Sequence, residues 1–270
     1  MVILAGVLMK HRLLNLLITT SAVSFLLALF AVNPQLTSAR EWSEIESQGK
    51  LKVAVKDNLR PLGFTTKNGD LVGLEIDIAR KLAEELLKDS KAIAFLPVDN
   101  QSRLQVILEG EVDLAIARVT VTTPRSRIVD FSPYYYLDGT GIVTKNQEID
   151  NVRSLPFTRI AVLKNSATIA VIRHRIPTAK LIGVESYQAA LELMESDQAD
   201  AFAGDRSVLT GLTQEYPNYR LLPARLSGSA LAVVMPKGLQ YQELRAKVNR
   251  AIANLQESGW LAERIKYWGL

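Results

Sequence analysis

The stretch LEGEVDLAIAR, residues 108–118, carries the pattern on which the fold prediction depends. A polar helix end leads to Asp113, and a short run of apolar residues then ends at Arg118. A short, nearly continuous apolar run is typical of a strand that is buried on both faces of a parallel sheet. We therefore expect residues 112–117 to form an inner strand that ends at a polar group.

A second stretch, MESDQADAFAGD at residues 194–205, has the same plan. It too has a helix end, an aspartate and a short apolar strand that ends at a polar residue, here Asp205. This repeat suggests two similar lobes. Each lobe would present polar groups at the carboxyl end of a strand, where ligands bind in open α/β sheets.

Helical and strand patterns alternate through both halves of the chain. Ala79, Leu82, Ala83 and Leu86, for example, have the spacing of one face of an amphipathic helix. The expected helices are 41–49, 74–87, 102–110, 166–176 and 186–196, and the expected strands are 50–55, 92–98, 112–117, 159–164, 179–184 and 199–205. Such alternation predicts an α/β fold with largely parallel sheets that are covered on both faces.

Two extended segments connect the halves. Residues 130–146 leave the first half, and the apolar segment 228–238 precedes a final helix. We expect both segments to cross between the lobes, which makes a hinge rather than a flexible linker. The predicted organisation is lobe I at 40–138 and 235–270 and lobe II at 139–234.

The first 39 residues have the pattern of a secretory signal peptide. The basic residues Lys10 to Arg12 precede a long apolar run, and the small residues Thr37 and Ala39 follow Pro34. We predict a signal peptide at 1–39, cleaved after Ala39, and an exported protein. The alternative is an uncleaved membrane anchor, because the run approaches the roughly 20 residues that span a bilayer.

Composition excludes several other functions. The chain contains no cysteine, so thiolate metal sites, a thiol nucleophile and a lipid anchor on cysteine are ruled out. A net charge of +4 is too small to indicate a nucleic-acid surface. The sequence has no Ser/His/Asp ordering, phosphate loop or H-E-x-x-H motif, and we expect His174 to lie on the surface. No metal or cofactor is predicted.

Residues 120–125 are the first candidate binding segment. A guanidinium such as Arg125 binds a carboxylate through two parallel hydrogen bonds, and a hydroxyl such as that of Thr120 can complete the shell. Thr123 and Pro124 also suit the N-cap and first position of a helix whose amino end would favour an anion. The alternative is a capped surface helix with a solvated arginine.

The other candidates follow strands. Asp205 ends the apolar strand of lobe II and could accept an ammonium group, although it could equally cap the helix that begins after it. Four cations are expected near the same rim in lobe I, and together they would favour an anionic group on the ligand. They are Lys56, Arg60, Arg103 and Arg118.

These segments, in this order, resemble the periplasmic polar amino-acid-binding proteins of ABC importers, over nearly all of residues 41–269. The similarity includes NGDLVGLEIDIARKLAEEL (68–86), SRLQVILEGEVDLAIA (102–117), TVTTPRSRIVDFSPYYY (120–136), VESYQAALELMESDQADAFAGD (184–205) and SGWLAERIKYWG (258–269). The resemblance implies a two-lobed, hinged Venus-flytrap fold with two crossovers.

The resemblance also implies roles for individual residues. Arg125 would bind the α-carboxylate of an amino acid with help from Thr120, and Asp205 would bind the α-ammonium group. Receptors for glutamate and aspartate resemble this chain at Ser102-Arg103 and at Lys56. The resemblance implies that Arg103 would reach a side-chain carboxylate of the ligand. The remaining candidate ligand residues are Ser166 and Thr168, in the KNSAT loop, and Arg118, which stands where relatives more often have a small residue or Asn.

The implied function is that of a monomeric receptor, not an enzyme. It would capture a free L-amino acid, preferably an acidic one, in the periplasm and deliver it to an ABC permease in the inner membrane. Two alternatives stay open. One is a receptor for a polar neutral or basic amino acid, and the other is a periplasmic enzyme that resembles cyclohexadienyl dehydratase, because such enzymes share the fold.

Overall fold

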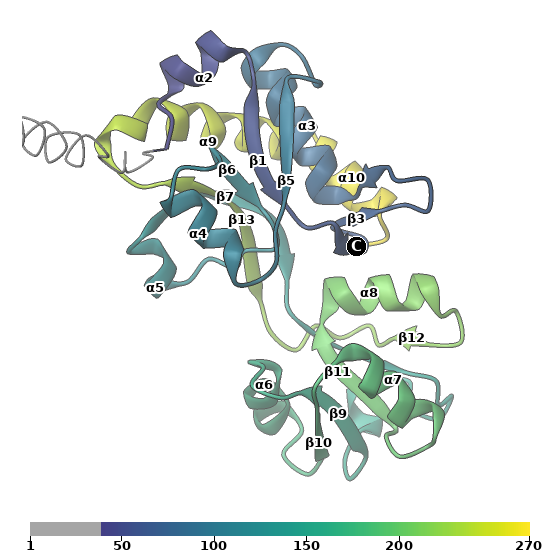
Figure 1. The fold of residues 1–270 in the computed structure, drawn as a ribbon. Helices are drawn as coiled ribbons and strands as arrows, with labels where there is room; N and C mark the ends of the chain where they lie inside the picture. The colour runs from purple at the N-terminus through teal and green to yellow at the C-terminus, as the bar shows by residue number, and fades with distance from the viewer. Residues whose placement is uncertain (1–38) are drawn as a thin grey trace, which may run out of the picture. The chain divides into compact units, whose positions relative to one another are not determined.

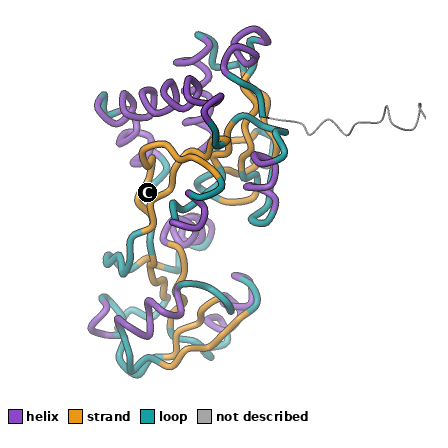
Figure 2. Tube along the Cα trace, turned by 90° about the vertical axis from the view of Figure 1, so that its left-hand side faces the viewer, coloured by secondary structure: helices purple, strands orange, loops and turns teal. Residues whose placement is uncertain are grey.

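A computed structural model describes residues 39–270. The predicted signal peptide lies outside the described residues apart from its last residue, Ala39. Within the described residues, the strands form two five-stranded sheets and one three-stranded sheet. Figures 1 and 2 show the two large sheets as separate groups of strands, each with its own helices.

The first sheet has the strand order β5-β1-β6-β13-β7. β1 (Leu51–Val55) pairs in parallel with β5 (Ile93–Pro97) and with β6 (Leu114–Ile116). β13 (Ser229–Pro236) is antiparallel to β6 and to β7 (Val129–Asp138). The sheet is therefore mixed, and strands from both ends of the chain build it.

Side chains that alternate along these strands fill two cores. Val53, Val55 and Leu114 lie in the core that includes α3 (Leu74–Leu87), α9 (Gln242–Glu257) and α10 (Trp260–Tyr267). Ala54 and Ala115 lie in the other, with side chains of α4 (Ser102–Leu108). Because both faces are covered, the central strand β6 is apolar and buried throughout, as the pattern at 112–117 predicted.

The second sheet repeats the arrangement with the order β10-β9-β11-β8-β12. β9 (Arg159–Leu163) pairs in parallel with β10 (Lys180–Val184) and β11 (Ala201–Asp205). β8 (Thr140–Thr144) is antiparallel to both of its neighbours, β11 and β12 (Arg220–Leu221). Its helices are α6 (Thr168–Arg175), α7 (Tyr187–Glu195) and α8 (Arg206–Glu215). Ile160 and Val162 face one core and Ala161 faces the other.

The aspartate that precedes the strand in each repeated stretch has the same structural role in both sheets. Asp113 accepts a hydrogen bond from the Lys52 amide at 2.7 Å, and Asp200 accepts one from the Arg159 amide at 2.7 Å. Each carboxylate thereby joins the loop before one parallel strand to the start of its neighbour. These backbone hydrogen bonds account for both aspartates by a structural role alone.

Two segments cross between the sheets side by side. β7 leads through Gly139 into β8, and the return passes through Ser227 into β13. Thr140 donates its amide hydrogen to Ser227 Oγ at 2.9 Å. A Cβ on Gly139 would lie 1.9 Å from the carbonyl oxygen of Ser227, so only glycine lets the two crossovers approach this closely.

The smaller elements include one difference from the sequence analysis. α2 (Trp42–Gln48) ends at Gly49, and β2 (Asn58–Leu59), β3 (Gly63–Thr65) and β4 (Leu71–Val72) form the small sheet. α5 (Thr123–Ser126) is a single turn with Thr122, not Thr123, at the N-cap, and the Thr122 side chain makes no capping bond. The predicted cap is wrong by one residue, because the preceding bridge from Thr120 to Leu231 keeps the chain extended only as far as Thr122.

Candidate functional site

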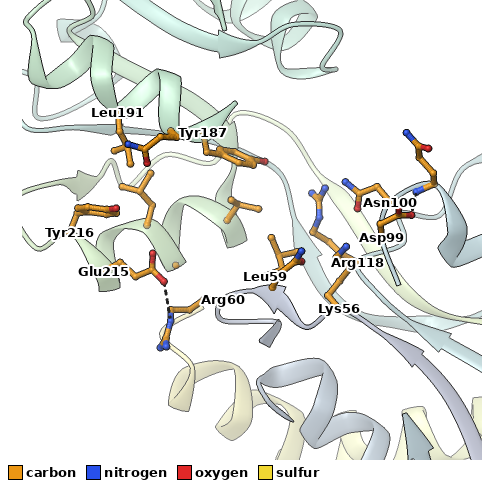
Figure 3. A pocket seen from close by; sticks show the side chains of 16 residues that line it. Lys56, Leu59, Arg60, Asp99, Asn100, Arg118, Tyr187, Leu191, Glu215 and Tyr216 are labelled. Carbon is orange, nitrogen blue, oxygen red and sulfur yellow. Dashed lines mark hydrogen bonds and ion pairs between the residues drawn. The ribbon is translucent and has the colours of Figure 1, made fainter. Parts of the chain in front are cut away.

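Loops that follow strands of the first large sheet, the small strand β2, and the helices α7 and α8 beside the second large sheet line a cavity of about 670 Å³. Figure 3 shows Lys56, Leu59, Arg60 and Arg118 facing it from β2 and from loops next to the first sheet, and Tyr187, Leu191, Glu215 and Tyr216 facing it from α7, α8 and the residue after α8. Its size falls in the range of small-molecule sites, which are roughly 300–1,000 Å³. It is the candidate ligand site.

Arg118 reaches across the cavity from the end of β6. Its guanidinium forms an ion pair with the carboxylate of Asp205, at the end of β11. The two repeated stretches of the sequence therefore end in residues that meet. Burial by itself would lower the pKa of Arg118, but the charge and hydrogen bond of Asp205, together with Tyr187 and Asp138, outweigh burial and raise it.

The backbone of Arg118 is held in an unusual conformation. Its φ is +51°, in the left-handed region that few residues other than glycine adopt. Its amide donates to Glu75 Oε1 at 2.7 Å, and its carbonyl oxygen accepts from Arg103 NH1 at 2.5 Å. Glu75 and Arg103 together fix the direction in which the Arg118 side chain leaves the strand.

Arg103 is buried beneath the cavity wall. Its guanidinium donates to the carbonyl oxygen of Ala117 at 2.8 Å as well as to that of Arg118. Burial and the nearby charges of Arg118 and Arg125 lower its pKa to about 10. In this structure Arg103 contacts backbone carbonyls and does not line the cavity.

Lys56 lies at the cavity wall, after β1. Its side chain is buried, and Nζ donates to the carbonyl oxygen of Val98 at 2.8 Å. Burial and the charge of Arg103 lower the pKa of Lys56. Arg60, the remaining predicted cation, also lines the cavity and contacts Glu215 Oε1 through Nε at 3.5 Å.

Asp205 occupies the N-cap position of α8 without capping it. Asp138, at the end of β7, accepts the Ser207 amide at 3.0 Å and the Ser207 hydroxyl at 2.5 Å instead. A residue of the crossover therefore caps this helix. Because Asp138 does so, the carboxylate of Asp205 is left to face Arg118.

Arg125 and Thr120 lie together beside the cavity. Arg125 NH1 donates to the backbone carbonyl oxygen of Thr120 at 2.9 Å. Partial burial and the charge of Arg118 lower the pKa of Arg125. Arg118 therefore interacts electrostatically with both Arg125 and Asp205. Neither Arg125 nor Thr120 is among the residues that line the cavity.

Ser166 and Thr168 stand apart from this group. Thr168 is the buried first residue of α6, and the Ser166 hydroxyl is buried without a hydrogen-bond partner among the described residues. Neither lines the cavity. Of the predicted site residues, Lys56, Arg60 and Arg118 line the cavity, and Asp205 does not line it but contacts Arg118. Arg103 and Arg125 lie in contact with Arg118 or within reach of its charge, and the two hydroxyls do not line the cavity.

Sequence reasoning missed Glu75 and its partner Tyr135. Both side chains are almost fully buried, and the Tyr135 hydroxyl donates to Glu75 Oε1 at 2.5 Å. Burial raises the pKa of Glu75 to about 7. The sequence did contain a signal for Glu75, because it lies one turn before Ala79 on the apolar face of α3. Burying a charged side chain there costs free energy unless it has a partner.

Within residues 39–270, no cluster of three or more potential ligand residues could hold a metal ion. No helix in the same range has the length and apolarity needed to cross a membrane.

Two α/β lobes, two crossovers and a polar cavity lined from both lobes define a two-lobed ligand receptor of the binding-protein type. The family comparison agrees: residues 51–270 match the family of bacterial extracellular solute-binding proteins, family 3, and the chain belongs to it. The two-lobed α/β fold predicted from the sequence is confirmed.

Individual relatives show how far the likeness extends. The chain is 28% identical over 227 residues to the ABC transporter glutamine-binding protein GlnH of Bacillus subtilis, covering 83% of this chain and 82% of the relative. It is 32% identical over 187 residues to the glutamine-binding protein of Geobacillus stearothermophilus, covering 68% and 71%. A solved structure, the Ancestral Cationic Amino Acid Solute Binding Protein, superposes with a TM-score of 0.71 at 25% identity and covers 84% of this chain and 98% of that one.

Proposed function

We propose that this protein is the receptor of an ABC importer that binds one free L-amino acid between its lobes. Arg125, with Thr120, would bind the α-carboxylate, and Asp205 would accept the α-ammonium group. The observation that supports this most directly is the position of Asp205, whose carboxylate is paired with the cavity-lining Arg118 while Asp138 caps the helix that follows Asp205. The relatives named for amino acids support the ligand class.

An acidic amino acid is the ligand that we favour. Lys56, Arg60 and Arg118 line the cavity with two acids, Asp99 and Glu215; Glu215 is paired with Arg60, and Arg118 is paired with Asp205. Arg103 and Arg125 add positive charge nearby. A site with this excess of cations attracts a ligand that carries an extra carboxylate.

The proposal also includes the location of the protein and its partner. An exported, monomeric protein in the periplasm, released by cleavage after Ala39, would hand its ligand to a permease in the inner membrane. The extracellular family to which the chain belongs supports export. Mass spectrometry of the protein isolated from its native cells tests the cleavage site, since an intact leader would contradict it.

A thermal-shift screen of the proteinogenic L-amino acids tests the function. A ligand that binds only the folded state raises the melting temperature, and we expect glutamate or aspartate to give the largest rise. A preference for glutamine, as in the named relatives, or for a basic amino acid would overturn the acidic choice but leave the receptor. No rise with any amino acid would overturn the receptor itself.

The screen is completed by a test for catalysis. We expect purified protein to leave prephenate and arogenate unchanged over hours, because a receptor needs no group that transfers protons to its ligand. Steady turnover of either compound that is lost on Asp205→Asn would identify an enzyme on this fold.

A further inference from the structure

We propose that Arg118 is the specificity-determining residue of this receptor: it must release Asp205 to the ammonium group of the ligand, and it then pairs with a second carboxylate that the ligand supplies. This inference rests on the proposed function and refines it. The ligand class it names is an α-amino acid with a carboxylate in its side chain.

Arg118 holds the position that the ammonium group would take. Its guanidinium is paired with the carboxylate of Asp205, and α8 does not depend on that carboxylate for capping. An ammonium group cannot bind Asp205 fully while the guanidinium stays in place. The guanidinium occupies Oδ2 of Asp205, so a zwitterion can use both oxygens of this carboxylate only if the Arg118 side chain turns away.

Only the side chain can turn. The amide and carbonyl groups of Arg118 are fixed by the buried side chains of Glu75 and Arg103, at 2.7 and 2.5 Å. The guanidinium can therefore move by rotation about its own side-chain bonds, within the cavity that it lines.

Both acids on the cavity wall already have polar partners of their own. Asp99 accepts hydrogen bonds from the Gln101 amide and from both the amide and hydroxyl of Ser102. Glu215, the other lining acid among the described residues, contacts Arg60. The positive neighbours Lys56, Arg103 and Arg125 would repel the guanidinium further.

An unpaired guanidinium in this place is costly. The Arg118 side chain is only 16% exposed, and its Nε is buried without a hydrogen-bond partner among the described residues. A partly buried charge that loses its partner is destabilised strongly, whereas a carboxylate offers a guanidinium two parallel bonds. A side-chain carboxylate on the ligand supplies that partner, and a side-chain amide supplies no charge.

Three ligands of similar shape separate the two parts of the proposal, which are the binding of the ammonium group by Asp205 and the pairing of Arg118 with a second carboxylate. L-Glutamate has both an ammonium group and a second carboxylate, L-glutamine lacks the second carboxylate, and glutarate lacks the ammonium group. Isothermal titration of the parent should show glutamate binding at least about tenfold more tightly than either of the others.

Arg118→Met removes the charge but keeps an unbranched side chain. We expect its preference for glutamate over glutamine to fall at least about tenfold, and glutamine to bind more tightly than it does to the parent, because Asp205 is then free. The control is Arg250→Met, at an exposed position of α9 remote from the cavity lining, which should bind like the parent.

The inference is overturned if Arg118→Met keeps the parental preference. It is also overturned if the parent binds glutarate as tightly as glutamate, because the ammonium group would then add nothing and Asp205 would not be released to it. This measurement uses the parent protein and does not depend on the folding of a variant. A parent that prefers glutamine overturns the role of Arg118 but not the receptor. A parent that binds no amino acid at all overturns both.

Discussion

Arg118 combines the unusual features of this site in one residue. A left-handed backbone is sterically costly for a side chain as large as arginine, and it persists only where its surroundings fix it. Here a buried carboxylate and a buried guanidinium do so, from α3 and α4. The positive charge presented to Asp205 therefore depends on residues that do not touch the cavity.

Arg125→Ala tests the assignment of the α-carboxylate. Loss of bonds to a charged group should weaken the binding of every amino acid by about ten- to a hundredfold, without changing their order of affinity. Isothermal titration measures this. Arg127→Ala, two residues away and exposed, is the matched control and should bind normally. Parental affinity in Arg125→Ala would contradict the assignment.

Glu75 predicts a dependence of stability on pH. Its pKa is raised by burial from 4.5 to about 7, so between these values the folded state holds a proton that the unfolded state has lost. The contribution of Glu75 to the free energy of unfolding therefore falls as pH rises from about 4.5 to 7, by up to about 3 kcal/mol.

Urea unfolding of the parent and of Glu75→Gln across this pH range measures the effect. The glutamine variant cannot lose a proton, so the parent should lose stability relative to it as pH rises. A difference between the two proteins that stays constant, or that moves in the opposite direction, would show that Glu75 remains ionised when folded.

At the scale of helices and strands, the crossovers depend on one glycine. A side chain at Gly139 would meet the Ser227 carbonyl oxygen at 1.9 Å, whereas one at Gly228 would meet only Leu137 Cδ1 at 3.7 Å. We expect Gly139→Ala to lower the free energy of unfolding by about 1–3 kcal/mol and Gly228→Ala to change it little. Equal stability of the two variants in urea would mean that the crossovers separate easily.

The sequence alone predicted the alternating helices and strands well, because burial on both faces leaves a clear apolar signal in strands such as β6 and β11. The caps were harder. Asp205 is a good N-cap by residue type, but Asp138, 69 positions from Ser207 in the sequence, performs this task. Local patterns do not report such a long-range contact.

The sequence allowed the types of residue in the site to be predicted, but not which of these residues contact one another. Cations and an aspartate after strands pointed to the cavity, but Arg103 and Arg118 look equivalent in the sequence. Only the fold shows that Arg103 is committed to backbone carbonyls while Arg118 faces Asp205.

At the scale of the whole molecule, α8 contacts the first lobe beside the cavity. A Cβ on Gly211 would lie 2.2 Å from the carbonyl oxygen of Arg60, and Gln214 Nε2 donates to the carbonyl oxygen of Trp268 at 2.8 Å. Glycine at position 211 thus permits an approach between lobes that alanine would prevent.

Gly211→Ala should therefore weaken ligand binding without unfolding the second lobe, because alanine favours a helix over glycine by about 1 kcal/mol. Small-angle X-ray scattering should show a smaller contraction on adding ligand than the parent shows. Thr213→Ala, on the same helix, removes a hydroxyl that bonds only to the helix itself and serves as the control. Parental contraction and affinity in Gly211→Ala would exclude this contact from closure.

The central claim is that a guanidinium of one lobe and a carboxylate of the other bind the two ends of an amino acid. A crystal structure of the protein with L-glutamate tests it most directly. We predict the α-carboxylate within hydrogen-bonding distance of Arg125 and Thr120, the ammonium group on Asp205, and the side-chain carboxylate on Arg118. A ligand bound in the cavity with its ammonium group away from Asp205, and with Arg118 still paired to that residue, would contradict the account.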